Sequence, residues 1–373
     1  MSRLLFIRYK KTAGKILEGG EQCSERNVSV LRTLLGEDNV DVCYIHDETL
    51  HASPLRRLGN YAVGAEGLLH NRFYGLTRRR VRAIVSQAIG GAYDYVYIDR
   101  SVFGVLAYRL KESGYQGRII CFFHNVEDVY FDCKLPKHLP FRGVVVRCAR
   151  ANDRYACRYA DSILVLNERD ADALRQRHGR TTDALVPIAM RDRYADAQPS
   201  QELTSSRPLC LCVGSYFPPN CEGIEWLARE VMPHVDARLL VVGKGMSRLR
   251  EHYAIPEEVE VVGDAPDLRP YFEQADVMVL PIFKGSGMKV KTCESLMYGK
   301  NIIGTPEAFE GYDLQHDRVG AVCADAAQFI QAIQSFVATP RPRFNAYSRS
   351  VFLEHYSEDV VSQQFAAILA KGE

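Results

Sequence analysis

The sequence lacks a long hydrophobic run, and no stretch approaches the ~20 apolar residues that a membrane-spanning helix needs. We therefore expect any contact with a membrane to be peripheral. The apolar part of the opening MSRLLFIRYKK is too short for a secretory signal peptide, and it predicts a first β-strand. Low-complexity segments and short repeats are also absent, which favours a folded globular protein over a disordered or fibrous one.

Closely paired cysteines are missing as well. The eleven cysteines form no C-x-x-C pair, and they are scattered singly except for Cys210 and Cys212, which share an apolar run. Zinc sites and thiol redox motifs need cysteines at short, regular spacing. We therefore expect buried, reduced thiols in a reducing cytoplasm, and no structural zinc.

The chain also lacks a large net charge, but its two halves differ. Residues 1–200 contain 31 Lys and Arg against 23 Asp and Glu, a net charge of +8, whereas residues 201–373 contain 16 against 23, a net charge of −7. A basic half favours an acidic partner, such as nucleic acid, anionic lipid headgroups or a phosphorylated acceptor. Solvated basic helices explain the same charge, so both interpretations stay open.

Arginines concentrate the positive charge at two places in the first half. One set recurs at helical spacing and the other forms a cluster. The two sets are Arg147, Arg150, Arg154 and Arg158, and Arg78, Arg79, Arg80 and Arg82. Each set is suited to lipid headgroups or a lipid diphosphate acceptor, and each is equally consistent with a solvated helix face.

The length of the chain and its pattern of apolar runs indicate two domains. A chain of 373 residues exceeds one ordinary core. Short β-rich runs alternate with amphipathic segments of helix length, which is typical of βαβ units on a parallel sheet. The runs are residues 4–7, 40–45, 95–98, 119–123 and 162–165, and then residues 209–213, 238–242, 259–262, 276–280 and 301–303. We predict an α/β fold with two Rossmann-like domains.

A polar, proline-containing stretch near residues 195–207 has no periodicity and predicts the linker. The predicted domains are therefore residues 1–195 and 208–345. Residues 346–373 are amphipathic and predict a C-terminal helix that packs across the domains.

Residues 281–311, PIFKGSGMKVKTCESLMYGKNIIGTPEAFEG, contain the strongest functional signal. Gly285 and Gly287 let backbone N–H groups approach an anion at the positive end of the following helix. Lys289 and Lys291 add full charges, and Glu294 can accept hydrogen bonds from sugar hydroxyls. Residues two apart on a helix point in different directions, so both lysines reach one diphosphate only if Lys289 precedes or begins the helix.

Three more glycine-containing loops follow predicted strands of the second half. They are GSYFPPNCEG (214–223), GKGMS (243–247) and GDAPD (263–267), and they join FKGSGMK (283–289). Ligands of open α/β sheets bind beyond the carboxyl ends of the strands. Four such loops in register therefore indicate one ligand site.

In their order, four segments closely resemble the donor domain of glycosyltransferase family 4, the retaining sugar transferases of GT-B fold, over about 110 residues. The segments are VGSYFPPNCEGIEWL, LLVVGKG, VEVVGDAPDLRPYFEQADVMVLP and GSGMKVKTCESLMYGKNIIGTPEAFEG. The first half is more loosely similar to the acceptor domain of that family. The similar features are Gly19 and Gly20 after a strand, FFHNVED (122–128) and RYADSILVLNERDADAL (158–174).

The resemblance implies two domains that face each other across a cleft and transfer a sugar with retention. The donor is a nucleotide diphosphate sugar, and the acceptor is a glycan, a lipid-linked group or a protein. No metal, other cofactor or nucleic acid is expected. Helix dipoles and lysines would do the work that a divalent cation does elsewhere. The implied setting is surface polysaccharide or glycolipid assembly at the cytoplasmic face of a membrane.

The resemblance also implies roles for individual residues. Glu294 would bind the ribose, while Lys289 and Lys291 would neutralise the diphosphate together with the amides of Gly287 and Met288. The other implied donor-side positions are Gly214, Ser215, Asn220, Gly243, Lys244, Gly263, Asp264, Ala265 and Ser286. His124, with Gly19, Gly20 and Asn125, would meet the transferred sugar and the acceptor.

Two departures from the family pattern affect the donor site. Many members have an acid eight residues before the second glutamate, where this chain has Ser286, so the identity of the sugar stays open. Many also have an arginine and a lysine where this chain has Ser215 and Asn220. The diphosphate charge is then expected to fall more heavily on Lys289 and Lys291.

Two alternatives stay open: a sugar nucleotide epimerase of similar architecture, and a non-catalytic subunit that binds a sugar nucleotide. The serine at position 286 keeps the second of these open. A dehydrogenase is disfavoured, because no G-x-G-x-x-G with a downstream acid follows the first strand.

Overall fold

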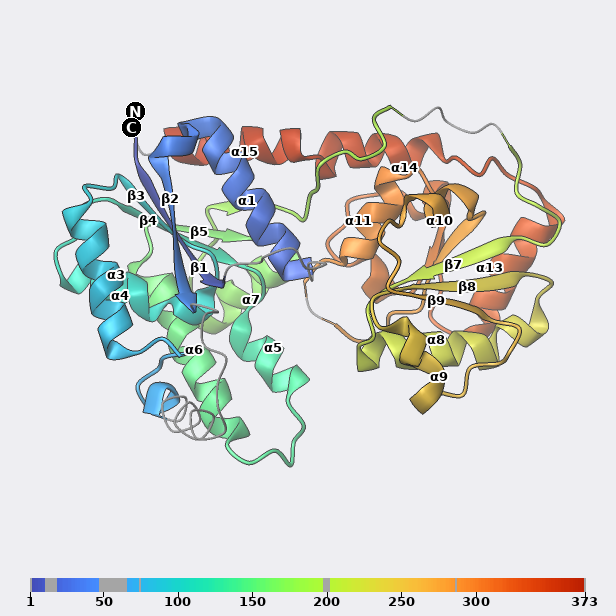
Figure 1. The fold of residues 1–373 in the computed structure, drawn as a ribbon, viewed down its shortest axis with the longest axis horizontal. Coiled ribbons are helices and arrows are strands. Elements are labelled where there is room, and N and C mark those ends of the chain that lie inside the picture. The colour runs from blue at the N-terminus through green and yellow to red at the C-terminus, as the bar shows by residue number, and fades with distance from the viewer. Residues whose placement is uncertain are drawn as a thin grey trace. The chain divides into compact units, whose positions relative to one another are not determined.

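A computed structural model describes residues 2–10, 19–46, 66–73, 75–196, 202–285 and 287–371. The chain divides into two compact units, one formed by Met1–Pro187 with Val361–Glu373 and the other by Ile188–Val360 (Figure 1). Each unit contains a six-stranded parallel sheet, which confirms the predicted α/β fold. The division falls at Pro187 rather than at the predicted residue 195, and the described part of the predicted linker belongs to the second unit.

The sheet of the first unit has the strand order β2-β1-β3-β4-β5-β6. Its strands are β1 (Leu4–Lys10), β2 (Val40–His46), β3 (Tyr95–Ile98), β4 (Arg118–Phe123), β5 (Ser162–Val165) and β6 (Ala184–Leu185). Five of them match the predicted runs, while β6 is two half-buried residues at the edge and was not predicted. The strand order reverses between β1 and β3, which makes this the topological switch point, where ligands of such sheets bind.

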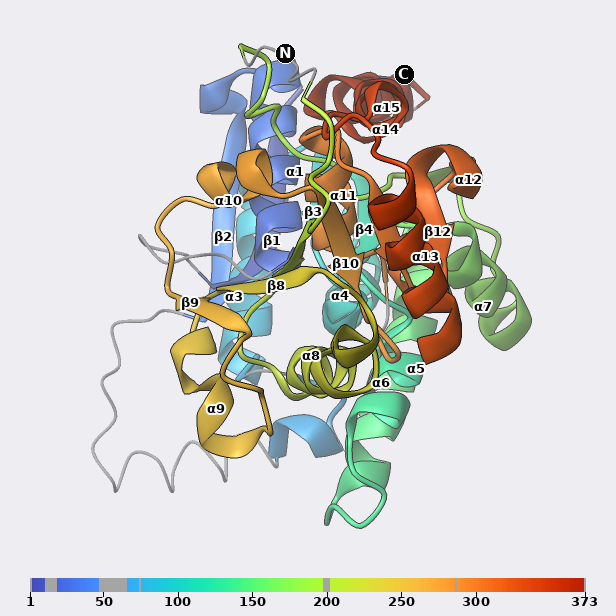
Figure 2. The same ribbon diagram turned by 90° about the vertical axis from the view of Figure 1, so that its right-hand side faces the viewer.

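Helices cover both faces of this sheet (Figures 1 and 2). They are α1 (Gly19–Leu35), α3 (Arg78–Gly90), α4 (Val105–Glu112), α5 (Glu127–Lys134), α6 (Arg142–Tyr159), α7 (Glu168–His178) and α15 (Glu358–Ala370). Successive strand residues point to opposite faces. Leu5 and Ile7 join the core that also includes buried residues of α3, α4 and α6. Phe6 points to the other face, and because both faces are buried, the strand is apolar throughout.

Aromatic rings on this second face attach α15 to the sheet. The ring of Tyr97 stacks on that of Phe6 at a centroid distance of 4.6 Å and lies 6.4 Å from Phe122. Phe365 of α15 packs against Tyr97 at 6.1 Å and is fully buried. Asn27 of α1 donates a hydrogen bond of 3.0 Å to the Tyr97 hydroxyl, so α1 and α15 meet at the same side chain.

The sheet of the second unit has the order β12-β11-β10-β7-β8-β9. Its strands are β7 (Leu209–Val213), β8 (Arg238–Gly243), β9 (Glu260–Gly263), β10 (Val277–Leu280), β11 (Ile302–Gly304) and β12 (Gly320–Val322). The first five match the predicted runs to within one residue, and β12, which is short and half-buried, was not predicted. The order reverses between β7 and β10, so the loops that follow these two strands flank the switch point.

Figure 1 shows α8 and α9 on one side of this sheet and α10, α11 and α14 on the other. The helices are α8 (Pro218–Glu230), α9 (Leu249–His252), α10 (Arg269–Gln274), α11 (Val290–Met297), α12 (His316–Val319), α13 (Ala326–Ala338) and α14 (Ala346–Val351). Helix α8 begins with Pro218, whose fixed φ suits a first helical turn and whose missing N–H is not needed there.

The C-terminal segment differs from the single predicted helix. After α14 the chain forms a π-helical turn, Phe352–Tyr356, and then an extended residue, Ser357. Met190 donates to the carbonyl of Tyr356 and accepts from the N–H of Glu358, at 3.1 Å each. These bonds interrupt the helix, so α14 belongs to the second unit and nearly all of α15 to the first. Within the described ranges, no helix combines the length and the apolar character needed to cross a membrane.

Replacing Phe365 with alanine is expected to loosen α15 from the first unit. The substitution removes a fully buried ring, so the free energy of unfolding should fall by about 3–5 kcal/mol. Urea titration followed by circular dichroism measures this change. The matched control is Gln363→Ala on the exposed side of α15, which should change stability by less than about 0.5 kcal/mol. Equal effects of the two substitutions would contradict the packing described.

Candidate active site

The two loops at the switch point of the second unit lie against each other. Gly223 of α8 is packed so closely on the end of β10 that a Cβ there would approach the carbonyl oxygen of Pro281 to 2.0 Å. The glycine therefore lets α8 reach the chain that leads into the loop of residues 283–289. Gly214, at the end of β7, and Pro281, at the end of β10, thus open the two sides of one site.

Two further loops join this site through backbone contacts. A Cβ on Gly243 would lie 1.9 Å from the Gly214 carbonyl oxygen, and its φ of 153° also favours glycine. The carbonyl of Lys244 accepts a hydrogen bond of 2.8 Å from the N–H of Tyr216. Asp264 accepts from the N–H of Gly245 at 2.9 Å. The predicted loops at 214, 243 and 263 are therefore one connected assembly, with Ala265 buried beside it.

Lys291 reaches into this assembly from the first turn of α11. Its Nζ donates a hydrogen bond of 2.9 Å to Oδ1 of Asn220, whose amide nitrogen donates to the Ser215 carbonyl at 2.9 Å. The same Nζ lies 3.3 Å from the position of a Cβ on Gly214. Burial lowers the pKa of Lys291 to about 8, because a buried ammonium loses its hydration. Asn220 thus holds a partly desolvated cation against the end of β7.

Glu294 lies three residues further along α11, on the same side of the helix as Lys291. Burial raises the pKa of its carboxyl to about 7, although the positive charges of Arg193 and Lys291 oppose the shift. Arg193 lies in the segment that follows Pro187, and no pattern in the sequence connects it with Glu294. Its position near Glu294 depends on how that segment returns to α11.

Lys289 precedes α11, which is the position predicted for a lysine that shares a ligand with Lys291. Its side chain, however, contacts Gly287 and Glu307. It is the N-terminal capping residue of the helix, with extended backbone angles. Its Nζ donates to the carbonyl of Gly287 at 2.6 Å and to Oε1 of Glu307 at 2.7 Å. Glu307 lies in the loop after β11 and was not predicted as a site residue. Met288 is buried, and its sulfur accepts from the N–H of Ile188, while Ser286 lies outside the described residues.

The first unit gathers three polar side chains near its own switch point. His124 follows β4, Asp99 follows β3 and Ser24 lies on α1, and all three are at least 96% buried. Nε2 of His124 lies 3.3 Å from Oδ1 of Asp99, and Oγ of Ser24 lies 2.5 Å from Oδ2. Burial lowers the pKa of His124, which favours the neutral form of the ring. Because a carboxylate only accepts, Nε2 carries the ring hydrogen and Nδ1 is left as an acceptor.

Gly20 lies beside this histidine at the start of α1. A Cβ on Gly20 would meet Nη2 of Arg100 at 2.7 Å and Nδ1 of His124 at 3.8 Å. Gly19 begins the same helix, and Asn125 follows His124 and is half-buried. Gly20 and His124 are thus brought together with Asp99, Ser24 and Arg100, which sequence reasoning missed. The polar Asp99-Arg100 pair directly after β3 is a signal that could have pointed to two of these three residues.

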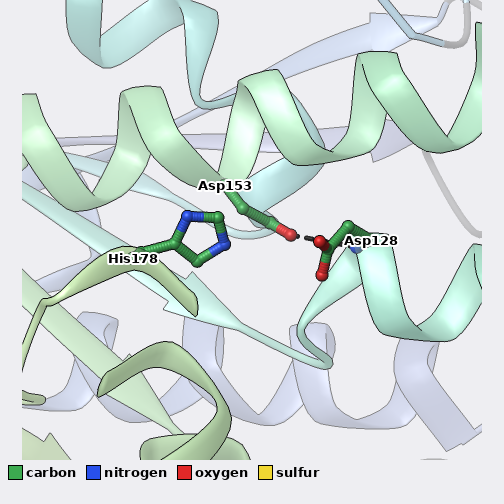
Figure 3. Close-up of side chains that lie close together, drawn as sticks. All are labelled: Asp128, Asp153 and His178. Carbon is green, nitrogen blue, oxygen red and sulfur yellow. Dashed lines mark hydrogen bonds between the residues drawn. The ribbon is translucent and has the colours of Figure 1, made fainter. Parts of the chain in front are cut away.

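Asp128, Asp153 and His178 converge from α5, α6 and α7, as Figure 3 shows, with candidate metal-ligand atoms within 4.8 Å of one another. One oxygen of each carboxyl and Nε2 of the histidine are buried without a hydrogen-bond partner among the described residues. However, Arg150 and Arg177 each donate to Oδ2 of Asp128 at 3.1 Å. A divalent cation would lie next to two guanidinium groups, and burial raises the pKa of Asp153 well above its usual value. The charges therefore do not suit a metal ion.

The cysteines and the two sets of arginines lie in different environments. All eleven cysteines are unpaired, and ten of them are buried, as predicted. Arg147, Arg150, Arg154 and Arg158 form an exposed stripe on α6. Of the second set, Arg80 turns inward, where its guanidinium bonds to the carbonyl of Tyr44, while the other three arginines are exposed.

Comparison with known proteins identifies the class of the second unit. Residues 207–339 match the family described as glycosyl transferases group 1, which confirms the resemblance predicted from the sequence. Most of the second unit thus matches the glycosyl transferase group 1 family. No curated protein matches the chain.

Solved structures extend the likeness to the whole chain. HepE from Anabaena, solved in complex with UDP and glucose, is 12% identical with a TM-score of 0.64, and the match covers 100% of both chains. An α,α-trehalose-phosphate synthase (UDP-forming) from Burkholderia vietnamiensis is 14% identical with a TM-score of 0.65, covering 100% of this chain and 97% of that one. A glycosyltransferase from Rickettsia africae is 12% identical with a TM-score of 0.65, covering 100% and 98%. These likenesses show a shared fold, which is GT-B.

Replacing Asp99 with asparagine is expected to let the ring hydrogen of His124 occupy either nitrogen. The amide cannot act as an anionic acceptor, so the pKa of His124 should fall further and the ring hydrogen should no longer be confined to Nε2. Long-range ¹H–¹⁵N spectra of histidine-labelled protein report both quantities, with His124→Gln used to assign the signal. Exposed Asp172→Asn, on α7, serves as the control. An unchanged Nε2–H spectrum in Asp99→Asn would show that Asp99 does not hold the ring.

Proposed function

We propose that this protein is a retaining glycosyltransferase that moves a sugar from a nucleotide diphosphate sugar to an acceptor hydroxyl. The observation that carries the proposal is the buried ammonium of Lys291, which Asn220 holds against Gly214 at the switch point of a group 1 glycosyl transferase domain. A diphosphate is the ligand that suits a desolvated cation beside glycine-lined backbone. HepE, solved with UDP, has the same fold and supports this choice of ligand.

The proposed donor site follows from the positions of the side chains. Lys291, with the backbone amides of Gly287 and Met288 before α11, would bind the diphosphate. Glu294 would accept hydrogen bonds from the ribose hydroxyls, and the backbone from Gly263 to Ala265 would flank the nucleobase. Lys289 would supply a second charge after exchanging its present partner, Glu307, for phosphate. This exchange makes the contribution of Lys289 conditional, whereas Lys291 already faces the site.

Charge development explains how such a site would accelerate the transfer. As the sugar becomes oxocarbenium-like, the departing diphosphate gains negative charge, which Lys291 and the helix dipoles would stabilise more than they stabilise the ground state. The departing phosphate oxygen can take the proton of the acceptor hydroxyl, which gives substitution on the same face. We propose that these groups act without a metal ion, since they provide positive charge where a cation would otherwise be needed.

The first unit would bind the acceptor. Nδ1 of His124, which lies 3.8 Å from the position of a Cβ on Gly20, would act as an acceptor of hydrogen bonds. Such a nitrogen can orient a hydroxyl of the transferred sugar or of the acceptor. We propose that the acceptor is a glycan, a lipid-linked sugar or a protein in surface polysaccharide or glycolipid assembly. The exposed arginine stripe on α6 and the unpaired thiols support a cytoplasmic location at an anionic membrane face.

Substitutions in the donor site should reduce turnover. Lys291→Ala, Glu294→Ala and Lys289→Ala are each expected to lower kcat/KM by at least ~100-fold, which corresponds to about 2.7 kcal/mol. The donor is first identified by a thermal shift screen of nucleotide sugars, because a ligand of the native state raises Tm. Lys284→Ala, in the same loop but with a 79% exposed side chain, is the control and should change kcat/KM less than about twofold.

Two outcomes of this assay would reject the proposal. Interconversion of the donor in the absence of any acceptor would indicate an epimerase. Binding of a nucleotide sugar without turnover across a broad acceptor panel would indicate a non-catalytic subunit. Near-normal rates in both Lys291→Ala and Glu294→Ala would move the donor site elsewhere.

The pH dependence of kcat/KM should show an acidic and an alkaline limb, which report pKa values of groups in the free enzyme. The rate should fall as the pH drops below about 7, because Glu294 becomes protonated and loses its negative charge and part of its acceptor capacity. It should also fall as the pH rises above about 8, because Lys291 loses its charge. Lys291→Arg, which stays charged, should move the alkaline limb upward, and Glu294→Gln should remove the acidic limb. A profile that is the same in all three proteins would assign the limbs to other groups.

A further inference from the structure

The first unit contains a cavity of about 690 Å³ between α3 and α4, away from His124 and Asp99. Residues of α3, α4 and the preceding segment 66–73 line it. They are His70, Arg72, Arg78, Val81, Arg82, Val85, Ser86, Val105, Arg109, Glu112 and Ser113. A volume of this size is in the range of small-molecule sites. The proposed sugar transfer makes no use of this cavity.

The wall of the cavity has an excess of positive charge. Four arginines line it, and two glutamates pair with some of them: Glu66 contacts Arg72 at 2.5 Å and Arg78 at 3.6 Å, and Glu112 contacts Arg109 at 2.5 Å. The four arginines therefore exceed the two glutamates by two positive charges. Arg82 makes no ion pair or hydrogen bond with any residue in the described part of the chain.

Arg72 points to a ligand independently of the charge count. Its side chain is only 7% exposed, and Nη2 is paired with Glu66. Its Nε is buried without a hydrogen-bond partner among the described residues. An unsatisfied, buried N–H of a guanidinium group is costly, and Arg72 lines the cavity, where an anion would offset the charge of that group.

The positions of the arginines on α3 are consistent with an anion in the cavity. Arg78 and Arg82 are four residues apart on one face of the helix, where two like charges destabilise it. Arg80 turns away to the carbonyl of Tyr44, and Arg79 is exposed and does not line the cavity. Only two of the four clustered arginines therefore face the space, and a shared anion would offset their repulsion.

The floor of the cavity is apolar, formed by Val81, Val85 and Val105. Arginine recognises phosphate through paired N–H groups, and valines exclude water from an attached non-polar part. We propose that this cavity is a second anion site that binds the phosphate group of an organic phosphate. The phosphate can belong to a soluble molecule or to a lipid headgroup, and the experiment distinguishes the two.

Calorimetric titration with inorganic pyrophosphate in 150 mM NaCl tests the site in the full-length protein. Arg82→Glu is expected to weaken binding at least tenfold, and Ser86→Glu, a second exposed position in the cavity, should do the same. Arg79→Glu is the matched control, because it reverses one charge on the same turn of α3 outside the cavity. It should change affinity less than twofold, since salt screens charges beyond about 8 Å.

The donor site is separated from this test by Lys291→Ala, which should leave the second site intact. Loss of all pyrophosphate binding in Lys291→Ala would overturn the proposal and would leave the donor assignment standing. Equal weakening by Arg79→Glu and Arg82→Glu would overturn it as well, because only general charge would then matter. Persistence of binding in Lys291→Ala together with its loss in the double variant Lys291→Ala/Arg82→Glu supports the second site whatever the fate of the donor assignment.

Vesicles identify the source of the phosphate. The protein is sedimented with phosphatidylcholine vesicles with and without phosphatidic acid. Binding that requires phosphatidic acid and is lost in Arg82→Glu, but not in Arg79→Glu, would assign the site to a lipid headgroup. Pyrophosphate binding with no sedimentation would assign it to a soluble phosphate. Failure of both probes to bind at the cavity would reject the proposal.

Discussion

The close approach of Gly214 and Gly243 is the constraint on which the proposed donor site depends. The carbonyl of Gly214 occupies the space that a side chain at position 243 would fill, so the ends of β7 and β8 meet with no atoms between them. This contact brings the loops after β7, β8 and β9 into one hydrogen-bonded assembly beside the switch point. The ammonium of Lys291 then has a fixed surface to approach, and Asn220 holds it there.

Burial gives the charges at this site their functional properties. Desolvation moves the pKa of Lys291 down to about 8 and that of Glu294 up to about 7, so both groups can change their charge near neutral pH. An incoming diphosphate would restore the stability of the ammonium, which couples ligand binding to protonation. Lys289 is different, because it is already neutralised by Glu307. The two lysines that look equivalent in the sequence are therefore unequal in the fold.

Burial of polar groups also shifts a pKa in the first unit, but at a histidine. Burial lowers the pKa of His124, while the contact with Asp99, which Ser24 also contacts, opposes that shift and positions Nε2 of the ring. Nearby, Asp128 is also buried but is matched by Arg150 and Arg177, which makes that group a closed ionic cluster. Arg72 and Arg82 lie in a third environment, where positive charge exceeds negative charge around an apolar floor. The balance of buried charge thus distinguishes an orienting site, a structural cluster and a site for an anion.

The amino-acid sequence by itself determined the α/β class, ten of the twelve strands and the glycine loops of the donor site, because apolar runs and glycines act locally. It did not reveal β6 and β12, which are short, half-buried and without a pattern of their own. The break at Ser357 was also hidden, since it depends on bonds from Met190, far away in the chain. Only the tertiary structure decided which charges meet: Lys289 with Glu307, Arg193 with Glu294, and His124 with Asp99. Such pairs join separate loops, and their energies depend on burial, which no local pattern of residues records.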